Sequence, residues 1–187
     1  MPSSSDTGAS AGQDELAGRL SDLARLLERQ DDVEDTLDAI VHAAVGTVPG
    51  AEHASISVVR RRREVMTRAS TSELPRAVDH AQYDSGQGPC LDSLFEQRTV
   101  RLSGVPNNRR WSEFTLRAAE LGVGSMLSLQ LYVDGDDLGA LNLISTEPDA
   151  FDDESEHVGL LLRRTPRSRW RAPRSSSSCA QRCTPAT

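Results

Sequence analysis

The chain has 187 residues with 37% hydrophobic side chains, 28 acidic and 21 basic groups and a net charge of −7, which is enough for one domain with extensions. No apolar run approaches the roughly 18 residues of a membrane span, and the first residues lack the basic start and apolar core of a secretory signal. We therefore expect a cytoplasmic protein without membrane association. The three cysteines, Cys90, Cys179 and Cys183, are too few and too scattered for a disulfide framework.

Charge is distributed unevenly along the chain. Every basic residue is arginine, which indicates a GC-rich bacterial genome because lysine codons are A-rich. Residues 163–187 hold seven arginines and no acid, whereas residues 1–162 hold 14 arginines and all 28 acids. An acidic body repels phosphate backbones, so we do not expect residues 1–162 to bind nucleic acid non-specifically.

The N-terminal region divides into two parts. Residues 1–12 are rich in serine, glycine and alanine, and we expect them to be disordered. Residues 13–30 predict an amphipathic helix, because leucines recur at alternating spacings of four and three. Two interpretations stay open: this helix packs on its own domain, or it forms a dimer with a second copy. The leucines are Leu16, Leu20, Leu23 and Leu27.

A second helix and a hairpin follow. Asp31 or Asp32 caps the helix, and Pro49-Gly50 ends it. Residues 54–60 and 64–70 alternate with the period of a strand, and the arginines at 61–63 form the turn between them. The buried face of the helix is expected to hold Val33, Leu37, Ile40, Val41, Ala44 and Val45.

The remaining elements complete an α+β pattern. Residues 73–81 predict a short helix, and Pro89 lies in the first turn of the next one. A short strand at 99–102 precedes a helix that Ser112 caps and Gly122 ends. Strands at 125–133 and 138–145 flank a turn, and acids open a last helix within 151–162. Two hairpins imply antiparallel pairing, so we expect one antiparallel sheet with helices packed on one face.

With these segments in order, the chain resembles the GAF domain family, and most closely the actinobacterial GAF domains that precede an ANTAR RNA-binding domain. The matching segments cover about residues 31–162 and define the expected sensory domain. They read "DDVEDTLDAIVHAAVGTVPGAEHASISVV", "GQGPCLDSL", "RWSEFTLRAAELGVGSMLSLQLYV", "LGALNLIS" and "AFDDESEHVGLLL".

The resemblance implies a five- to six-stranded antiparallel sheet with a small-molecule pocket, roofed by the segment from Gln87 to Leu94. Family members are mostly sensors and dimerisation modules, and in the two-domain regulators the ANTAR part binds paired RNA hairpins and prevents transcription termination. We therefore expect a homodimer that binds an unidentified small molecule without catalysis, and RNA binding only in a form that carries ANTAR. The residues expected at the ligand are Gln87, Gly88, Cys90, Asp92 and Trp111.

Cys90 allows more than one role. A thiol at a helix start has a lowered pKa, which would suit a redox sensor; a buried cysteine is more often a packing or pocket-lining residue. A nucleophile needs a base, and none of the four histidines stands in a catalytic motif. A methionine sulfoxide reductase of the GAF type needs several cysteines within the domain, and no cluster of ligands predicts a metal site.

The resemblance stops at Leu162. The tail, residues 163–187, changes to arginine, serine and proline, and Pro166 ends the preceding helix. One interpretation is a basic RNA-binding tail. A frameshift accounts for more: GC-rich codons read two nucleotides later permit "PHTAVALAGAQEQQQLRTALHTRD", which continues a helix into a polar linker. We therefore expect a truncated regulator whose tail is aberrant and disordered.

Overall fold

The computed structural model describes residues 14, 16–22, 24–25, 32–60, 64–96, 99–105, 108–132 and 138–162. The expectations for residues 1–12, for the arginine turn and for the tail at 163–187 lie outside these residues. Within them, no helix is both long and apolar enough to cross a bilayer.

Five antiparallel strands form one sheet in the order β2-β1-β5-β4-β3. The strands are β1 (His53–Arg60), β2 (Glu64–Ser70), β3 (Thr99–Leu102), β4 (Ser125–Tyr132) and β5 (Leu138–Ser145). β5 lies at the centre, between β4 of its own hairpin and β1 of the first hairpin. The α+β class and the antiparallel sheet predicted from the sequence are confirmed.

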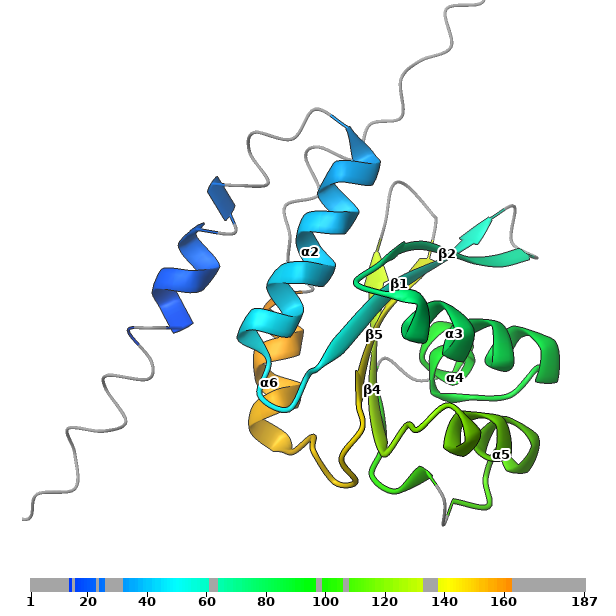
Figure 1. The fold of residues 1–187 in the computed structure, drawn as a ribbon. Helices are drawn as coiled ribbons and strands as arrows, with labels where there is room; N and C mark the ends of the chain where they lie inside the picture. The colour runs from blue at the N-terminus through cyan, green and yellow to red at the C-terminus, as the bar shows by residue number, and fades with distance from the viewer. Residues whose placement is uncertain are drawn as a thin grey trace, which may run out of the picture.

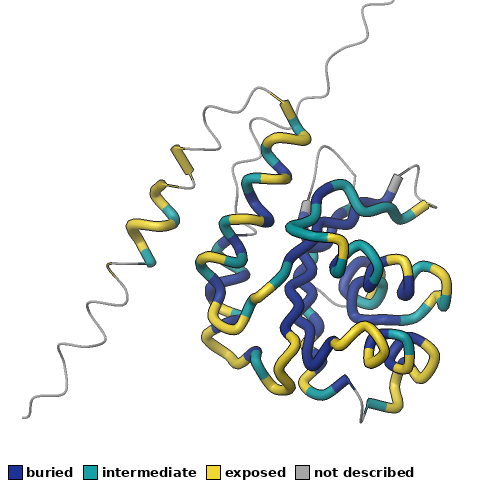
Figure 2. Tube along the Cα trace, viewed as in Figure 1, coloured by how far each residue is buried: buried dark blue, intermediate teal, exposed yellow. Residues whose placement is uncertain are grey.

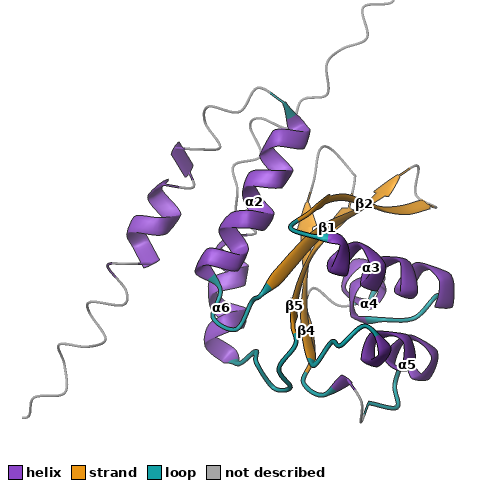
Figure 3. Ribbon diagram, viewed as in Figure 1, coloured by secondary structure: helices purple, strands orange, loops and turns teal. Residues whose placement is uncertain are grey.

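Helices cover both faces of the sheet, where the sequence led us to expect one (Figure 1). α2 (Val33–Thr47) and α6 (Asp153–Leu162) lie on one face, and α3 (Glu73–Ser85), α4 (Pro89–Phe95) and α5 (Ser112–Glu120) on the other. The three middle helices, α3, α4 and α5, each have an apolar side that must be buried. The second face of the sheet is the surface on which they bury it. In Figure 3 the strands accordingly run between two groups of helices.

Alternation along the strands supplies an apolar surface to each layer. Leu127, Leu129, Leu141 and Leu143 face α2 and α6. Next to them along the strands, Met126 and Ile144 face the other way and pack with Phe114 of α5. Figure 2 shows the result: the central strands are buried, whereas exposed residues lie on the outer sides of the helices and in the loops.

Local signals fix most helix ends. Asp32 is the N-cap of α2, and its carboxylate accepts a hydrogen bond from the backbone N–H of Glu34, as predicted. Gly122, with φ of 81°, ends the α5 region. Ser112 is the first residue of α5 rather than its cap; Trp111 holds the cap position without a side-chain hydrogen bond. α3 runs to Ser85, past the predicted end at residue 81, because its buried face continues to Gln82.

A β-bulge changes the direction of one side chain in β2. Ile56 pairs with Ala69, but the next residue, Ser57, pairs with Thr67, so Arg68 is the extra residue. Arg68 then reaches Glu34 of α2, on the same face as Ala69. Thr67 faces the opposite side, toward α3. The bulge therefore brings a hydroxyl into the layer beneath α3.

Candidate functional site

A row of polar side chains crosses the sheet face beneath α3 and α4. Asn142 of β5 pairs across the strands with Ser55 of β1 and with Ser128 of β4. All three are completely buried, as is Ser57. Because strands alternate, these polar groups occupy the positions between the leucines that face α2 and α6. A polar row this deep must be hydrogen-bonded to be stable.

Asp79 of α3 lies over this row and gathers its hydrogen bonds. The carboxylate oxygen Oδ1 accepts from Asn142 Nδ2 at 3.0 Å, and Oδ2 accepts from Thr67 Oγ1 at 2.8 Å and from Ser57 Oγ at 3.4 Å. Asn142 Nδ2 also donates to Ser57 at 3.0 Å, and its Oδ1 accepts from Ser128 at 2.9 Å. Within the described residues no ion pair reaches Asp79.

Tyr83 closes the network one turn further along α3. Its hydroxyl hydrogen-bonds with Ser57 at 2.6 Å and with Thr67 at 3.2 Å. We call this set the buried polar cluster. Its members are Ser55, Ser57, Thr67, Asp79, Tyr83, Ser128 and Asn142.

Burial dominates the electrostatics of the cluster. It raises the pKa of Asp79 to about 6, against the hydrogen bonds from Ser55, Thr67, Asn142 and Ser57, which favour the carboxylate. Burial and, after it, the negative charge of Asp79 also raise the pKa of Tyr83, so the phenol stays neutral. At neutral pH the cluster therefore holds one buried negative charge without a cationic partner among the described residues.

The α3–α4 turn contains two of the predicted site residues, Gln87 and Gly88, and a third, Cys90, follows as the second residue of α4, next to Ser57 and Asn142 of the cluster. Gly88 has φ of 138°, a conformation that L-residues rarely adopt, and its backbone lies against the side chain of Gln82. Gln82 is completely buried, and its Oε1 accepts from the Cys90 backbone N–H at 2.8 Å. Gln82 Nε2 and Gln87 Oε1 are buried and have no hydrogen-bond partner among the residues that the structure describes.

The Cys90 thiol is completely buried and does not have the lowered pKa that a helix start would give. Burial, and then the charge of Asp79, raises its pKa to about 12, and hydrogen bonding with Ser57 and Asn142 offsets this only in part. Cys90 therefore lies inside the site as a neutral thiol.

This burial predicts an unreactive native thiol. In a Cys179→Ser/Cys183→Ser variant, we expect iodoacetamide at pH 8 to modify native Cys90 at least about a hundredfold more slowly than the urea-unfolded chain, because the thiolate is the nucleophile. Mass spectrometry of timed aliquots gives both rates. Native alkylation, or oxidation by peroxide, at the rate of the unfolded chain would instead support a redox sensor.

Asp92 and Trp111, the other two predicted ligand residues, join α4 to α5. Asp92 Oδ2 forms an ion pair with Arg110 Nη2 at 2.6 Å. The same guanidinium lies 4.7 Å from the centre of the Trp111 ring. Trp111 packs in the core with Phe114. Both residues hold the two helices together, and neither takes part in the hydrogen bonds of the buried polar cluster.

The leucines predicted for dimerisation are partly described. Leu16 and Leu20 are half-buried and pack against the core that α2 and α6 share with the sheet. Leu23 and Leu27 lie outside the described residues. The packing interpretation thus applies to the first two leucines, and their remaining exposed surface leaves the dimer expectation untested.

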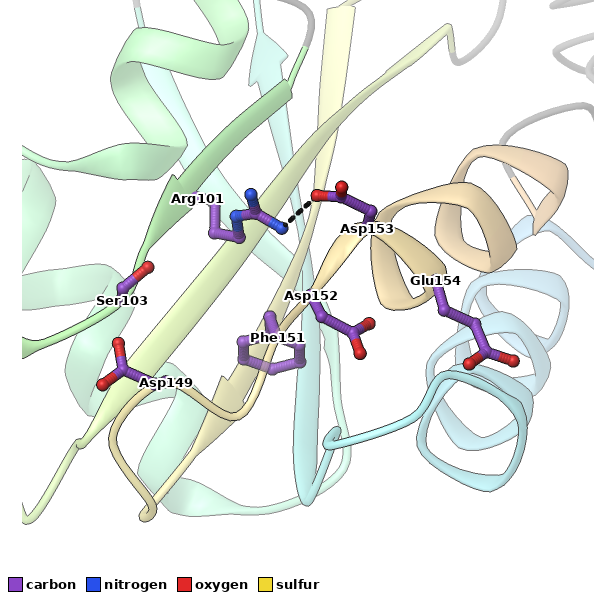
Figure 4. A pocket seen from close by; sticks show the side chains of 7 residues that line it. All are labelled: Arg101, Ser103, Asp149, Phe151, Asp152, Asp153 and Glu154. Carbon is purple, nitrogen blue, oxygen red and sulfur yellow. Dashed lines mark hydrogen bonds and ion pairs between the residues drawn. The ribbon is translucent and has the colours of Figure 1, made fainter.

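An open depression lies at the other end of the sheet, beside β3 and the start of α6 (Figure 4). Its volume is about 500 Å³, and no predicted site residue lines it. Arg101 forms an ion pair with Asp153 across it at 2.9 Å. No group of three or more acidic, histidine or cysteine side chains among the described residues could hold a metal ion.

Sequence reasoning missed the residues that build the cluster: Asp79, Asn142, Ser57 and Thr67. A signal was present for two of them. Asn142 interrupts the apolar segment "LGALNLIS", and Ser57 follows Ser55 by two in "ASISVV", which places both serines on one face of a strand. Asp79 gave no comparable signal, because an acid on a helix is ordinarily solvated.

An antiparallel sheet between two helical layers, with a closed polar interior beneath one of them, is the architecture of a small-molecule-sensing domain. The sequence model of the GAF domain matches residues 30–162. The chain therefore belongs to the GAF domain family.

Solved structures show the same fold. The free methionine-R-sulfoxide reductase of Neisseria meningitidis, in complex with its substrate, is 16% identical with a TM-score of 0.63, over 91% of this chain and 93% of that chain. The GAF domain of a Coxiella burnetii phosphoenolpyruvate-protein phosphotransferase is 17% identical with a TM-score of 0.60, over 79% and 87%. A putative GAF sensor protein from Burkholderia vietnamiensis is 15% identical with a TM-score of 0.61, over 82% of this chain and 92% of that chain. No curated protein matches the chain.

Proposed function

We propose that this GAF domain is the non-catalytic sensor of a bacterial transcription antitermination regulator, and that it binds a small molecule beneath the α3–α4 turn, next to the buried polar cluster. The observation that carries the proposal is a pair of buried atoms without a hydrogen-bond partner among the described residues: Gln82 Nε2 on α3, the helix that also carries the buried Asp79, and Gln87 Oε1 in the turn after it. Natural proteins leave few buried polar atoms unpaired, so two unpaired atoms next to a buried polar layer are a reason to expect a ligand.

The absence of catalysis is part of the proposal. Residues 30–162 contain a single cysteine, Cys90, and its thiol is neutral at physiological pH. A sulfoxide reductase that recycles through a disulfide needs a second cysteine near the first. A ligand bound here would instead act by shifting the balance between two conformations, for which it must bind one more tightly than the other.

Hydrogen exchange tests the sensing function. We expect the low-molecular-weight filtrate of a bacterial lysate to slow amide exchange several-fold in residues 73–95, because a ligand beneath α3 and α4 stabilises them against local opening. α2 and α6 cover the opposite face and serve as the internal control. Unchanged exchange in residues 73–95 with filtrates from several growth conditions would contradict ligand sensing at this site.

The antitermination part of the proposal rests on the resemblance to GAF domains that precede ANTAR and on the abrupt change of composition after Leu162. Resequencing the coding DNA across codons 155–190, with the intact mass of the native protein, tests it. We expect a shifted frame and a larger product that carries the RNA-binding part. A confirmed frame with a native mass near 20.3 kDa would contradict the frameshift.

We further propose that the regulator is a homodimer that pairs through residues 13–30. The heptad spacing of Leu16, Leu20, Leu23 and Leu27 supports this. Leu16 and Leu20 keep part of their surface exposed although they contact the domain core, so the same helix retains apolar surface for a second copy.

A further inference from the structure

The two unpartnered atoms at the α3–α4 turn differ in hydrogen-bonding character. Gln82 Oε1 already accepts from the Cys90 N–H, which fixes the amide so that Nε2 is the free donor. Gln87 Oε1 is a free acceptor. Each atom is shielded from solvent, and an unmet buried polar group costs about 1–3 kcal/mol. A molecule bound at this turn would therefore be favoured for supplying one acceptor and one donor.

We propose that the site beneath the α3–α4 turn takes a small neutral ligand that presents a carbonyl acceptor and an N–H donor side by side, as an amide, lactam or ureide does. The carbonyl would accept from Gln82 Nε2, and the N–H would donate to Gln87 Oε1. This inference rests on the proposed sensing function and names the chemical class of the ligand.

Charge excludes a carboxylate ligand. Asp79 stands three residues before Gln82 on α3, so the two side chains share one face of the helix. The carboxylate of Asp79 is completely buried, and no cation among the described residues pairs with it. A second buried anion beside it would be repelled, since like charges interact strongly where water is excluded. Tyr83 and Cys90, the ionisable groups that face Asp79 from α3 and α4, are neutral and provide no compensating charge.

Hydrogen-bond counting disfavours a purely cationic ligand. The Asp79 oxygens already accept from Asn142, Thr67 and Ser57, so the carboxylate does not depend on a ligand for its partners. An ammonium group has donors but no acceptor, and it would leave Gln82 Nε2 unpaired. An amide satisfies both free atoms and adds no charge.

The turn that covers the site contains two glycines that allow its backbone to change conformation. Gly86, with φ of 65°, and Gly88, with φ of 138°, flank Gln87 in conformations that favour glycine. A Cβ at position 86 would meet no atom, whereas one at position 88 would strike the side chain of Gln82. Rotation about these two glycines would move Gln87 while α3 and α4 stay on the sheet, which admits a ligand without unfolding either helix.

Three small probes of different charge, each with a three-carbon skeleton, test the ligand class: propionamide, propionate and propylammonium. Backbone amide NMR of the full chain follows residues 82–90 during titration at pH 7.5. We expect saturable shifts with propionamide at millimolar concentrations, at least tenfold tighter binding than for the two charged probes, and at least tenfold weaker propionamide binding in Gln82→Leu. Gln130→Leu is the control, because it removes a glutamine of β4 that bonds the Leu94 carbonyl instead.

Each other outcome overturns the inference. Equal or tighter binding of propionate or propylammonium at residues 82–90 would show a different ligand class while ligand sensing stands. If no probe shifts the NMR signals of these residues although the lysate filtrate slows their amide exchange, the proposed amide class is wrong and the sensing function stands. If neither has an effect, a buried water occupies the two atoms and the sensing function fails as well. Should Gln82→Leu not fold, Gln82→Met preserves the length of the side chain and gives the same comparison.

Discussion

Replacing Asn142 with leucine is expected to lower the free energy of unfolding by about 3 kcal/mol at pH 7.5, because leaving a buried hydrogen-bonding group without its partner costs about 1–3 kcal/mol and more when that group is charged. Asn142 Nδ2 donates to Asp79 at 3.0 Å and to Ser57 at 3.0 Å, and its Oδ1 accepts from Ser128 at 2.9 Å. A leucine with the same branching fills the space but breaks all three bonds. The carboxylate then keeps its burial and loses its amide donor.

Urea unfolding followed by circular dichroism measures this effect. Ser128→Ala is the matched control, because it removes a single neutral hydrogen bond and is expected to cost about 1 kcal/mol. The double variant Asp79→Leu/Asn142→Leu should be more stable than Asn142→Leu alone, since it removes the charge that lost its partner. A loss below about 1 kcal/mol in Asn142→Leu would mean that solvent reaches Asp79, which contradicts the closed cluster.

The second large effect concerns the pH dependence that Asp79 imposes. Because its pKa rises from 3.8 to about 6 on folding, the folded state holds its proton over a range where the unfolded state has released it. This proton thus contributes most to the stability of the native state at pH values below 3.8, the pKa of Asp79 in the unfolded chain, and the contribution is lost as pH rises through about 6, its pKa in the folded chain. The difference of about two pKa units corresponds to roughly 3 kcal/mol, of which about 2 kcal/mol is lost between pH 4.5 and pH 7.5.

Asp79→Asn isolates this contribution. The new amide keeps the shape, its oxygen can accept from Asn142, and the hydroxyls of Thr67 and Ser57 can rotate to accept from its NH₂. We expect the unfolding free energy of the variant, relative to the parent, to increase by about 2 kcal/mol from pH 4.5 to pH 7.5. The comparison cancels carboxyls with lowered pKa, such as Glu52 and Asp152, which act in the opposite direction. A difference that does not vary with pH would show that Asp79 titrates normally.

The sequence determined the elements because their signals are local. Asp32 at a cap, positive-φ Gly122 and alternation along "ASISVV" act within a few residues of themselves, and each was found in the expected place. Two hairpins also fixed the antiparallel character of the sheet. The second helical layer was missed, since which face a helix covers depends on residues distant in the chain.

In the candidate site, too, local sequence signals predicted one part and only the tertiary structure showed the other. The "GQGPCLDSL" segment indicated the turn at which Gln87 and Gly88 lie, because glycine and proline mark backbone conformation directly. The prediction could not find Asp79 and Asn142, which are 63 residues apart and hydrogen-bond at 3.0 Å. Only strand pairing places Asn142 opposite Ser55 and Ser128, and only the bulge opposite Ser57 turns Thr67 toward Asp79.

By itself, then, the sequence indicated the antiparallel sheet, because periodicity, caps and glycines act between neighbouring residues, and it indicated the family through the resemblance of whole segments. The tertiary structure decided what lies beneath the α3–α4 turn. It buried the Cys90 thiol beside a carboxylate and raised its pKa, against the local expectation for a helix start. Burial and pairing of distant residues set that pKa, since desolvation depends on everything that packs around a group and not on its neighbours in the chain.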